Sequence, residues 1–575
     1  MPLRSRAPLH IALALPAVLL AAALLLPPRA GATPLPPHTH PSQWVHIKLL
    51  AINDFHGALQ PRTEHGRPVG GAAVLAAYLQ AAAQRARDGA IIVEAGDQVG
   101  ASPPDSALLQ DEPAISVLNL LANAHCTAAD PLDPACNVVG TLGNHEFDEG
   151  VPELLRLLHG GNATHGPFLQ APWGGARFPV VCANVVDAAT GKPLLPPYVI
   201  KRVHGVPIAF VGAVLRATPS MVTPSGVAGV QFTDEASAIN RQVRALKAQG
   251  VRAIVAVIHQ GALQIPFEGT TPDIPTSPPR GPVMNIVRRL DDEVDVVISG
   301  HTHAFSNAIV TNGHGKHMLI TQAYAYGTAF AEIDLALEPT THDVVERSAR
   351  IVTTWGDAGP GLHPQPQVAA LVKAADAAVA VRVDQPVGRA AAAVSRREND
   401  SGESALGDLI ADAQRAAQHT DFAFINPGGI RADLPTGPVT WGDLFTAQPF
   451  GNDLVRMQLT GAQVLRLLEQ QWRGQAKPRI LQVSGLRYAW SDRKPKGHRV
   501  VQARDAAGKP LDPQRVYSVV VNSFLAAGGD NFSVFTEGTG QSVAGNDLDA
   551  MVAYVRALPQ PFRVATDGRI QRQEQ

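Results

Sequence analysis

Residues 294–303 read Val-Asp-Val-Val-Ile-Ser-Gly-His-Thr-His, a β-branched apolar run that stops at a glycine and two histidines. The same outline recurs along the chain, each time ending at residues that can bind a metal ion. The other runs are 51–53 before Asp54-Phe55-His56, 91–95 before Gly96-Asp97, 138–142 before Gly143-Asn144-His145-Glu146, and 254–258 before His259. Short Val/Ile runs bounded by glycine are typical of buried strands in a parallel sheet. Because sites in open α/β sheets form at the carboxyl ends of strands, we expect these side chains to meet.

Length and composition predict a globular protein with two large domains. The chain has 575 residues, more than a single hydrophobic core usually serves. Apolar residues make up 45% of it and charged residues 17%. The formal net charge is −2, so nothing indicates a nucleic-acid polymer or an anionic membrane as a partner. The sequence gives no indication of an oligomeric state.

The first residues are expected to be a secretory signal at 1–32, outside the fold. Arg4 and Arg6 form a basic start, residues 11–26 form an apolar stretch, and Ala30-Gly31-Ala32 fits a cleavage site. We therefore expect export to the periplasm or the medium, with no membrane attachment once the signal is cleaved. An uncleaved N-terminal anchor is the alternative, although the apolar stretch is short for a membrane span.

An exported chain can form disulfides, and this one has 3 cysteines. Cys126 and Cys136 flank a turn-rich loop at residues 130–134 and are expected to close it. Cys182 lies in a strand-like run and is expected to be a buried free thiol.

Strand-like runs alternate with helical patterns, such as residues 71–87 and 234–249, which indicates βαβ units and an α/β (α+β) chain. A Gly/Pro cluster at residues 359–364 then interrupts the pattern, and an Ala-rich run with helical propensity follows it. The expected division is a flexible leader at 33–45, a first domain at 46–358, a linker with a helix at 359–384 and a second domain at 385–570.

The strand-end residues together make a donor set large enough for two metal ions. They comprise carboxylates, imidazoles and one amide: Asp54, His56, Asp97, Asn144, His259, His301 and His303. Two divalent cations that share a bridging carboxylate need about this many ligands. The mixture of nitrogen and oxygen donors favours zinc, manganese, iron or cobalt over calcium or magnesium. Asp54-Phe55-His56 and Gly96-Asp97 are weak signals alone, and the Gly-Asn-His-Glu and Gly-His-Thr-His motifs are stronger, but only their joint order predicts a two-metal phosphoesterase.

The order Asp-x-His, Gly-Asp, Gly-Asn-His-Glu, His, Gly-His-x-His resembles that of the calcineurin-like metallophosphatases. The resemblance implies that Asp97 bridges two metals, and that the first domain is a β-sandwich flanked by helices instead of one open sheet. The other implied ligands are Asp54, His56 and His303 for one metal, and Asn144, His259 and His301 for the other.

By the same resemblance His145 and Asp148 are the expected catalytic pair, His145 as a histidine that is not a ligand and Asp148 as the acid that orients it. A carboxylate on one ring nitrogen fixes the tautomer and raises the basicity of the other nitrogen. A charged imidazolium facing the phosphoryl oxygens would stabilise the charge that develops there. The alternatives are a supporting role for His145 and a helix N-cap for Asp148, because a helical pattern begins after Gly150.

The C-terminal half contains three glycine turns: Asn426-Pro427-Gly428-Gly429-Ile430-Arg431, Gln448-Pro449-Phe450-Gly451-Asn452 and Phe524 to Asp530. Together with segment 402–413, which opens that domain in relatives, they resemble the 5′-nucleotidase C-terminal domain. Glycines let a ligand approach backbone N–H groups, and arginine can bind a phosphate or carboxylate with two hydrogen bonds. The implied substrate residues are Asn426, Gly429, Arg431, Phe450, Asn452, Phe524 and Asp530.

The resemblance implies that Phe450 and Phe524 hold the nucleobase between them and that Asp530 accepts hydrogen bonds from the ribose hydroxyls. Asn426 and Arg431 would contact the base or the charged end of the substrate. One position departs from the pattern, because some relatives carry a substrate arginine where this chain has Gly402. Arg396 or Arg397, a few residues upstream, is the candidate replacement.

The combined interpretation is an exported phosphohydrolase that removes the 5′-phosphate from nucleoside monophosphates by attack of a metal-activated water. Three other activities fit the same scaffold: 2′,3′-cyclic-nucleotide phosphodiesterase, pyrophosphatase acting on NAD or UDP-sugars, and a sulfur-oxidation hydrolase. An inactive nucleotide-binding protein is the alternative of another class, although the intact ligand set speaks against it.

Overall fold

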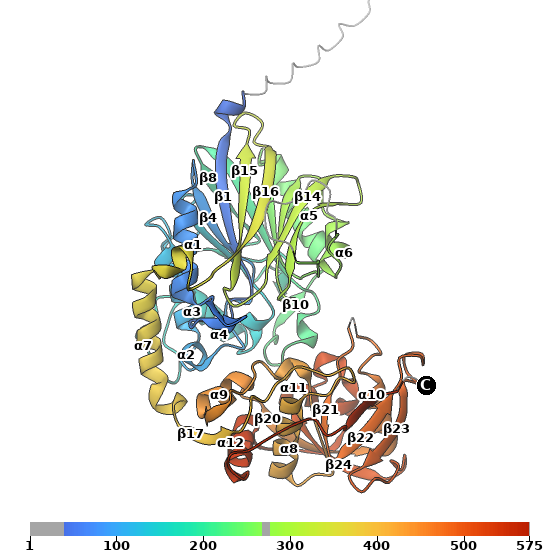
Figure 1. Cartoon of the computed structure of the whole chain (residues 1–575). Helices are drawn as coiled ribbons and strands as arrows, with labels where there is room; N and C mark the ends of the chain where they lie inside the picture. The colour runs from blue at the N-terminus through green and yellow to red at the C-terminus, as the bar shows by residue number, and fades with distance from the viewer. Residues whose placement is uncertain (1–39, 267–276, 476, 574–575) are drawn as a thin grey trace, which may run out of the picture. The chain divides into compact units, whose positions relative to one another are not determined.

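Two six-stranded sheets carry the strand-end motifs. The computed structural model describes residues 40–266, 277–475 and 477–573 (Figure 1), so the predicted signal at 1–32 lies outside the described residues, as does the leader up to residue 39. The first sheet has the order β16 (Val344–Thr353), β15 (Ala329–Leu337), β1 (Val45–Ile52), β4 (Ala90–Glu94), β5 (Val138–Thr141) and β6 (Val180–Val181). The second has the order β13 (Phe305–Thr311), β14 (His317–Ala323), β12 (Val294–Ser299), β11 (Ala253–His259), β9 (Val206–Val214) and β8 (Tyr198–Val203).

All five apolar runs are strands, and those that share a sheet run parallel. β1 pairs in parallel with β4, and β4 with β5, in the first sheet. β11 pairs in parallel with β12 in the second sheet. Neither sheet is wholly parallel, because β15 joins β1 and β8 joins β9 in antiparallel register. The paired sheets are the sandwich that the family resemblance implies.

Alternate side chains of β1 enter two different cores. Ile47, Leu49 and Ala51 belong to the cluster between the two sheets, which β11 and β12 complete from the other side. Leu50 and Ile52 belong to the cluster under the helices. This period of two is that of a strand. Residues 49–52 are buried on both faces and are all apolar, whereas His46 and Lys48 alternate with Val45 and Ile47 at the partly buried start of β1.

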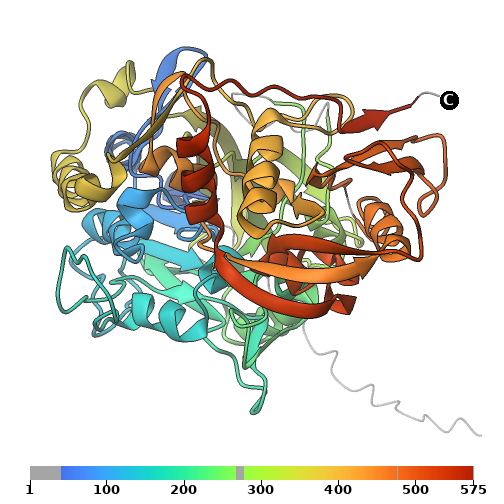
Figure 2. The ribbon, with the colours of Figure 1, turned by 90° about the horizontal axis from the view of Figure 1, so that it is seen from below.

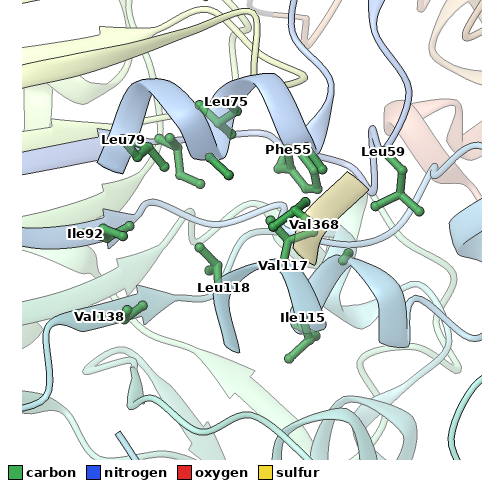
Figure 3. Packing of buried hydrophobic residues seen from close by; sticks show 14 of the residues in the cluster. Phe55, Leu59, Leu75, Leu79, Ile92, Ile115, Val117, Leu118, Val138 and Val368 are labelled. Carbon is green, nitrogen blue, oxygen red and sulfur yellow. The ribbon is translucent and has the colours of Figure 1, made fainter. Parts of the chain in front are cut away.

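Helices cover the outer face of each sheet. The first sheet is covered by α1 (Ala72–Gln84), α3 (Glu112–Leu121) and α7 (Pro366–Val383), and the second by α5 (Glu235–Ala248) and α6 (Val283–Val287). The predicted helical patterns at 71–87 and 234–249 correspond to α1 and α5. Figure 3 shows Leu75 of α1, Leu118 of α3 and Val368 of α7 packed with Ile92 and Val138 of the first sheet.

The C-terminal half is built on a separate five-stranded sheet. Its order is β21 (Gln482–Ser484), β18 (Phe422–Ile425), β24 (Val516–Asn522), β20 (Asp453–Thr460) and β25 (Thr539–Asn546). Side chains from α8 (Ala405–Gln418), α9 (Trp441–Ala447) and α12 (Asp547–Ala557) form one core against it, and α10 (Gly461–Glu469) contributes to another. Figure 2, seen from below, shows α8 and α12 side by side.

Shorter elements complete the described chain. They are β2 (Arg62–Glu64), β3 (Arg67–Val69), α2 (Pro104–Ala107), α4 (Val151–His159), β7 (Val185–Asp187), β10 (Val230–Phe232), β17 (Pro386–Ala390), β19 (Gly437–Thr440), β22 (Leu486–Trp490), β23 (Val500–Asp505), α11 (Ser523–Ala526) and β26 (Ile570–Arg572). Among the described residues, no helix has both the length and the apolar character needed to cross a membrane.

The cysteine predictions are confirmed. Cys126 and Cys136 form a disulfide, with their Cα atoms 4.6 Å apart. The loop that it closes is also tied to β8, where the buried Lys201 donates a hydrogen bond of 3.0 Å from Nζ to the carbonyl oxygen of Asp133. Cys182 is a buried free thiol, and burial raises its pKa to about 11.

Phe55 links the core to the first motif, because its ring packs under α1 while its two neighbours in sequence are predicted metal ligands (Figure 3). It is only 1% exposed. We expect Phe55→Ala to lower the free energy of unfolding by about 3–5 kcal/mol, since the truncation leaves a cavity. Urea unfolding measures this loss. The control is Val381→Ala on α7, whose side chain is 89% exposed and which should lower the free energy of unfolding by less than about 0.5 kcal/mol. Equal effects would contradict this placement of Phe55.

Candidate active site

Two groups of metal-binding side chains meet at the carboxyl ends of the strands. The first contains Asp54, His56 and His303, whose ligand atoms all lie within 4.8 Å of one another. The Nε2 atoms of His56 and His303 are 3.0 Å apart, and Nε2 of His303 is 3.3 Å from Oδ1 of Asp54. Asp54 and His56 follow β1, whereas His303 follows β12 in the other sheet, so the sandwich brings them together.

The second group contains Asp97, His259 and His301. Oδ2 of Asp97 lies 3.0 Å from Nε2 of His259 and 3.7 Å from Nε2 of His56, which belongs to the first group. One carboxylate oxygen therefore lies between the two groups, the position that a bridging ligand requires. Asn144 follows β5, directly before the catalytic candidate His145.

Hydrogen bonds to backbone carbonyls orient the imidazoles in a way that suits metal binding. Nδ1 of His56 lies 2.9 Å from the oxygen of Gly100, and Nδ1 of His259 lies 2.8 Å from that of Ala95. A carbonyl oxygen can only accept, so each Nδ1 carries the hydrogen and donates it. In the neutral ring, Nε2 then presents its lone pair to the group.

Burial and charge act differently on these histidines. Burial lowers the pKa of His56 well below its usual range and that of His301 to about 3. Both rings are therefore neutral, and each can offer a nitrogen lone pair to a metal ion. Burial also works to lower the pKa of His259, but the Asp97 carboxylate outweighs it and raises the pKa to about 10. A cation bound here would compete with that proton, because a ligating imidazole must be neutral.

An unpaired amide oxygen supports the same interpretation. Among the residues that the structure describes, Oδ1 of Asn144 is buried without a hydrogen-bond donor. Such a group costs free energy unless it finds a partner, and a cation is a suitable one. The donor set, its tautomers and this free oxygen all fit two divalent cations.

Five of the predicted ligands have a backbone in the left-handed region. Their φ angles are 51° for Asp54, 51° for His56, 54° for Asp97, 73° for His301 and 53° for His303. A non-glycine residue in this region costs on the order of 1–3 kcal/mol at strained sites. The turns after β1, β4 and β12 are therefore held in conformations that turn the side chains toward one point.

The close approach of Asp97 to the backbone of Gly143 explains why a glycine precedes Asn144. A Cβ atom on Gly143 would overlap Oδ1 of Asp97, so a side chain here would displace the central carboxylate.

Glu146 has a structural role that its sequence motif did not predict. The Glu146 carboxylate is buried and accepts hydrogen bonds from the backbone N–H groups of Asp97 (3.0 Å), Gln98 (2.7 Å) and Gly143 (2.5 Å). It thus fixes the turn that carries Asp97. Burial raises its pKa to about 7. The signal was its place in the Gly-Asn-His-Glu motif, but two of the three hydrogen bonds come from Asp97 and Gln98, which are distant in sequence.

The structure pairs His145 with Asp148, as predicted. Nδ1 of His145 lies 2.7 Å from Oδ2 of Asp148, and the backbone N–H of His145 donates to Asp97 over 2.9 Å. Burial works to lower the pKa of His145, but the Asp148 carboxylate outweighs it and the pKa lies above its usual value. Asp148 does not cap the next helix, because Gly150 occupies the N-cap of α4.

One cavity of about 840 Å³ adjoins the metal-binding groups and is lined by both halves of the chain. Asn144, His145, Asp148 and His301 line it from the N-terminal half. From the C-terminal half it is lined by every predicted substrate residue: Asn426, Gly429, Arg431, Phe450, Asn452, Phe524 and Asp530.

The two aromatic residues take different positions in this cavity. The ring of Phe450 stacks on His145, with ring centroids 5.9 Å apart and an interplanar angle of 20°. The ring of Phe524 lies against Gly529, where a Cβ atom would come within 2.5 Å of it. Phe450 therefore connects the wall that the C-terminal half contributes to the catalytic candidate His145.

Arg431 has buried guanidinium N–H groups that are free to bind a ligand. Within the described part of the chain, its Nε and Nη2 atoms are buried and have no hydrogen-bond partner. Its guanidinium lies 5.9 Å from the centroid of the Phe450 ring, so it is beside the stack on His145. Free, buried guanidinium donors are typical of a site for a phosphate or carboxylate.

The arginine beside Asp530 is not one of the two that the sequence suggested as replacements for the arginine missing at Gly402. A Cβ atom on Gly402 would meet Ile480 at 2.7 Å, which leaves little room for a side chain. Arg396 and Arg397 are absent from the described residues that line the cavity, whereas Arg479 is among them and pairs with Asp530. No sequence motif marked Arg479, because its proximity to Asp530 arises only in the folded chain.

The comparisons with known proteins agree with this geometry. Residues 47–305 match the calcineurin-like phosphoesterase family, and residues 381–537 match the 5′-nucleotidase C-terminal domain. The chain is 35% identical to "Endonuclease YhcR" of Bacillus subtilis, over 92% of this chain and 41% of that protein. It is also 35% identical to "Cell wall protein Lmo0130" of Listeria monocytogenes, over 91% of this chain and 68% of that protein.

A solved structure shares the fold over most of the chain. The 5′-nucleotidase precursor from Thermus thermophilus superposes with a TM-score of 0.75 at 28% identity, covering 92% of this chain and all of that one. The chain spans less than half the length of the first curated relative named above.

Metal binding can be tested by thermal unfolding. After chelator treatment, manganese or zinc at 100 times its Kd should stabilise the fold by about 2.7 kcal/mol per site and raise Tm. Asp97→Ala should lose most of this rise, because Asp97 lies between both groups. His363→Ala, an exposed histidine, should keep it. A wild-type Tm indifferent to manganese, zinc and cobalt would contradict the dimetal interpretation.

Proposed function

The chain belongs to the family that joins a calcineurin-like phosphoesterase to a 5′-nucleotidase C-terminal domain, a family of metal-dependent phosphoester hydrolases, and we propose that it removes the 5′-phosphate from nucleoside monophosphates. One observation carries the proposal: a single cavity adjoins the metal-binding groups, with Asn144 and His301 in its wall, and also contains the free Arg431 donors and two aromatic side chains. Its volume of about 840 Å³ lies within the range of small-molecule sites.

At the phosphate end, the residues of this chain bind and stabilise charge. Two divalent cations at the aspartate and histidine groups would supply an activated water and shield the phosphoryl oxygens. His145, held by Asp148 through Nδ1, is expected to donate a hydrogen bond from Nε2 to a phosphoryl oxygen. Arg431 is expected to bind the same group through its buried free donors.

At the nucleoside end, recognition combines stacking with hydrogen bonds. We assign base stacking to Phe450 and Phe524 and the ribose hydroxyls to Asp530. Stacking accepts every nucleobase because each has a π face. Asn426, Gly429 and Asn452 line the wall between these groups.

The same metal chemistry serves a cyclic nucleotide, NAD or a UDP-sugar, so a substrate panel of AMP, 2′,3′-cyclic AMP, NAD and UDP-glucose separates the alternatives. We expect AMP to have the highest kcat/KM of the four. A higher value for any other would replace the proposed substrate while leaving the metal chemistry intact.

We also propose that the chain is exported. The Cys126–Cys136 disulfide supports this, because disulfides persist in oxidising compartments. The relative named as a cell wall protein points to the same side of the membrane.

Asp97→Ala should lower kcat for AMP by roughly three orders of magnitude in metal-replete buffer, since several kcal/mol of charge stabilisation are lost at about 1.4 kcal/mol per tenfold in rate. The matched control is Asp376→Ala, an exposed carboxylate on α7. Steady-state rates for both variants test the assignment, which near-normal turnover of Asp97→Ala would sink.

Phe524→Ala should raise KM for AMP by roughly 5- to 150-fold, because stacking of a base contributes about 1–3 kcal/mol. Hydrolysis of p-nitrophenyl phosphate, which has no nucleobase, should change far less. Phe168→Ala, at an exposed ring outside the cavity lining, is the control. If both substrates lose activity equally, Phe524 supports the fold and does not bind the base.

A further inference from the structure

Arg479 and Asp530 form an ion pair inside the cavity. The proposed function puts the ribose of the substrate at this pair. The Asp530 side chain is 5% exposed and that of Arg479 is 33% exposed. The only shift at Arg479 comes from burial, which lowers its pKa, but a guanidinium remains charged at neutral pH.

Asp530 is held from several sides at once. Its Oδ2 accepts a hydrogen bond of 2.9 Å from Nδ2 of Asn426, and its backbone oxygen accepts one of 2.6 Å from Nε2 of Gln475. Its backbone lies in the left-handed region, with φ 55°. With Arg479 on Oδ1, both carboxylate oxygens have a fixed partner, and each keeps a lone pair for another donor.

The position of Arg479 is itself well determined. Its backbone N–H donates 2.9 Å to the carbonyl oxygen of Gln471. The next residue, Ile480, is buried and packs where Gly402 has no side chain. The guanidinium is therefore presented to the cavity by an anchored segment.

A ribose offers two neighbouring hydroxyl donors, and a carboxylate with two oriented oxygens can accept from both. A buried carboxylate without a cation would tend to take up a proton and lose that capacity. It would also repel the anionic phosphate of the same substrate. The arginine removes both difficulties, because the pair is neutral while the acceptor lone pairs remain.

We propose that Arg479 is a positioning residue that keeps Asp530 ionised and aimed at the ribose, and so makes the chain selective for nucleotides whose 2′ and 3′ hydroxyls are both free. The inference rests on the proposed function, since it takes Asp530 as the ribose acceptor. It names the substrate class more closely: 5′-ribonucleotides are preferred to 2′-deoxynucleotides and to nucleotides phosphorylated at O3′.

The test compares Arg479→Gln with Arg473→Gln, an exposed arginine in the same segment that lies outside the cavity lining. For Arg479→Gln we expect kcat/KM for AMP to fall about tenfold through KM, as for the loss of a hydrogen bond to a charged group. The fall for 2′-deoxy-AMP should be smaller, so the preference for AMP shrinks. Arg479→Lys should restore part of it. Equal falls for AMP and 2′-deoxy-AMP would overturn the proposal.

A double-mutant cycle with Asp530→Asn separates positioning from direct contact. If Arg479 acts through Asp530, Arg479→Gln should change KM for AMP less than about twofold in the Asp530→Asn background. A full tenfold effect there would overturn the positioning role. So would a larger loss for adenosine 3′,5′-bisphosphate than for AMP, because it would show that Arg479 binds an anion directly.

Failure of the proposed function would look different. A wild-type protein that hydrolyses p-nitrophenyl phosphate but not AMP overturns both proposals. Normal AMP hydrolysis with Arg479→Gln indistinguishable from Arg473→Gln overturns the role of Arg479 alone. Thermal unfolding of each variant, with Tm near that of the wild type, shows that the comparison concerns folded protein.

Discussion

The crowding of donor side chains at one edge of the two sheets is the constraint on which the rest of this structure depends. The ring nitrogens of His56 and His303 approach to 3.0 Å, and the Asp97 carboxylate lies between both groups. Such an arrangement is unfavourable in a cation-free interior and favourable around two cations. The left-handed turns, the glycine beside Asp97 and the buried Glu146 carboxylate all serve to hold it.

The sandwich makes this arrangement possible by giving each strand end a rigid base. The core between the sheets fixes β1 and β4 against β11 and β12, so side chains from opposite sheets meet at one edge. Phe55 secures the turn between two ligands from the helix-covered side. The C-terminal half then closes the cavity with Phe450, whose ring rests on His145.

The buried strands and the donor residues that follow them could be predicted from the sequence, because each depends on a short local segment, whereas the β-sandwich was implied only by the family resemblance. A run such as 294–299 specifies a buried strand, and the residues that follow it specify a donor. The remainder depends on contacts between distant segments. Nothing near Arg479 indicates its pairing with Asp530, which lies far along the chain, and the acceptor role of Glu146 requires the turn at Asp97. The mixed sheets escaped prediction for the same reason, since β15 joins β1 from a distant part of the sequence.

The division of the cavity between two halves has an evolutionary consequence. Every predicted metal ligand precedes residue 304, and every predicted substrate residue follows residue 425. Mutation can therefore reshape the recognition wall while the hydrolytic apparatus is inherited unchanged. A chain built on this plan can therefore change its substrate through substitutions in one half alone.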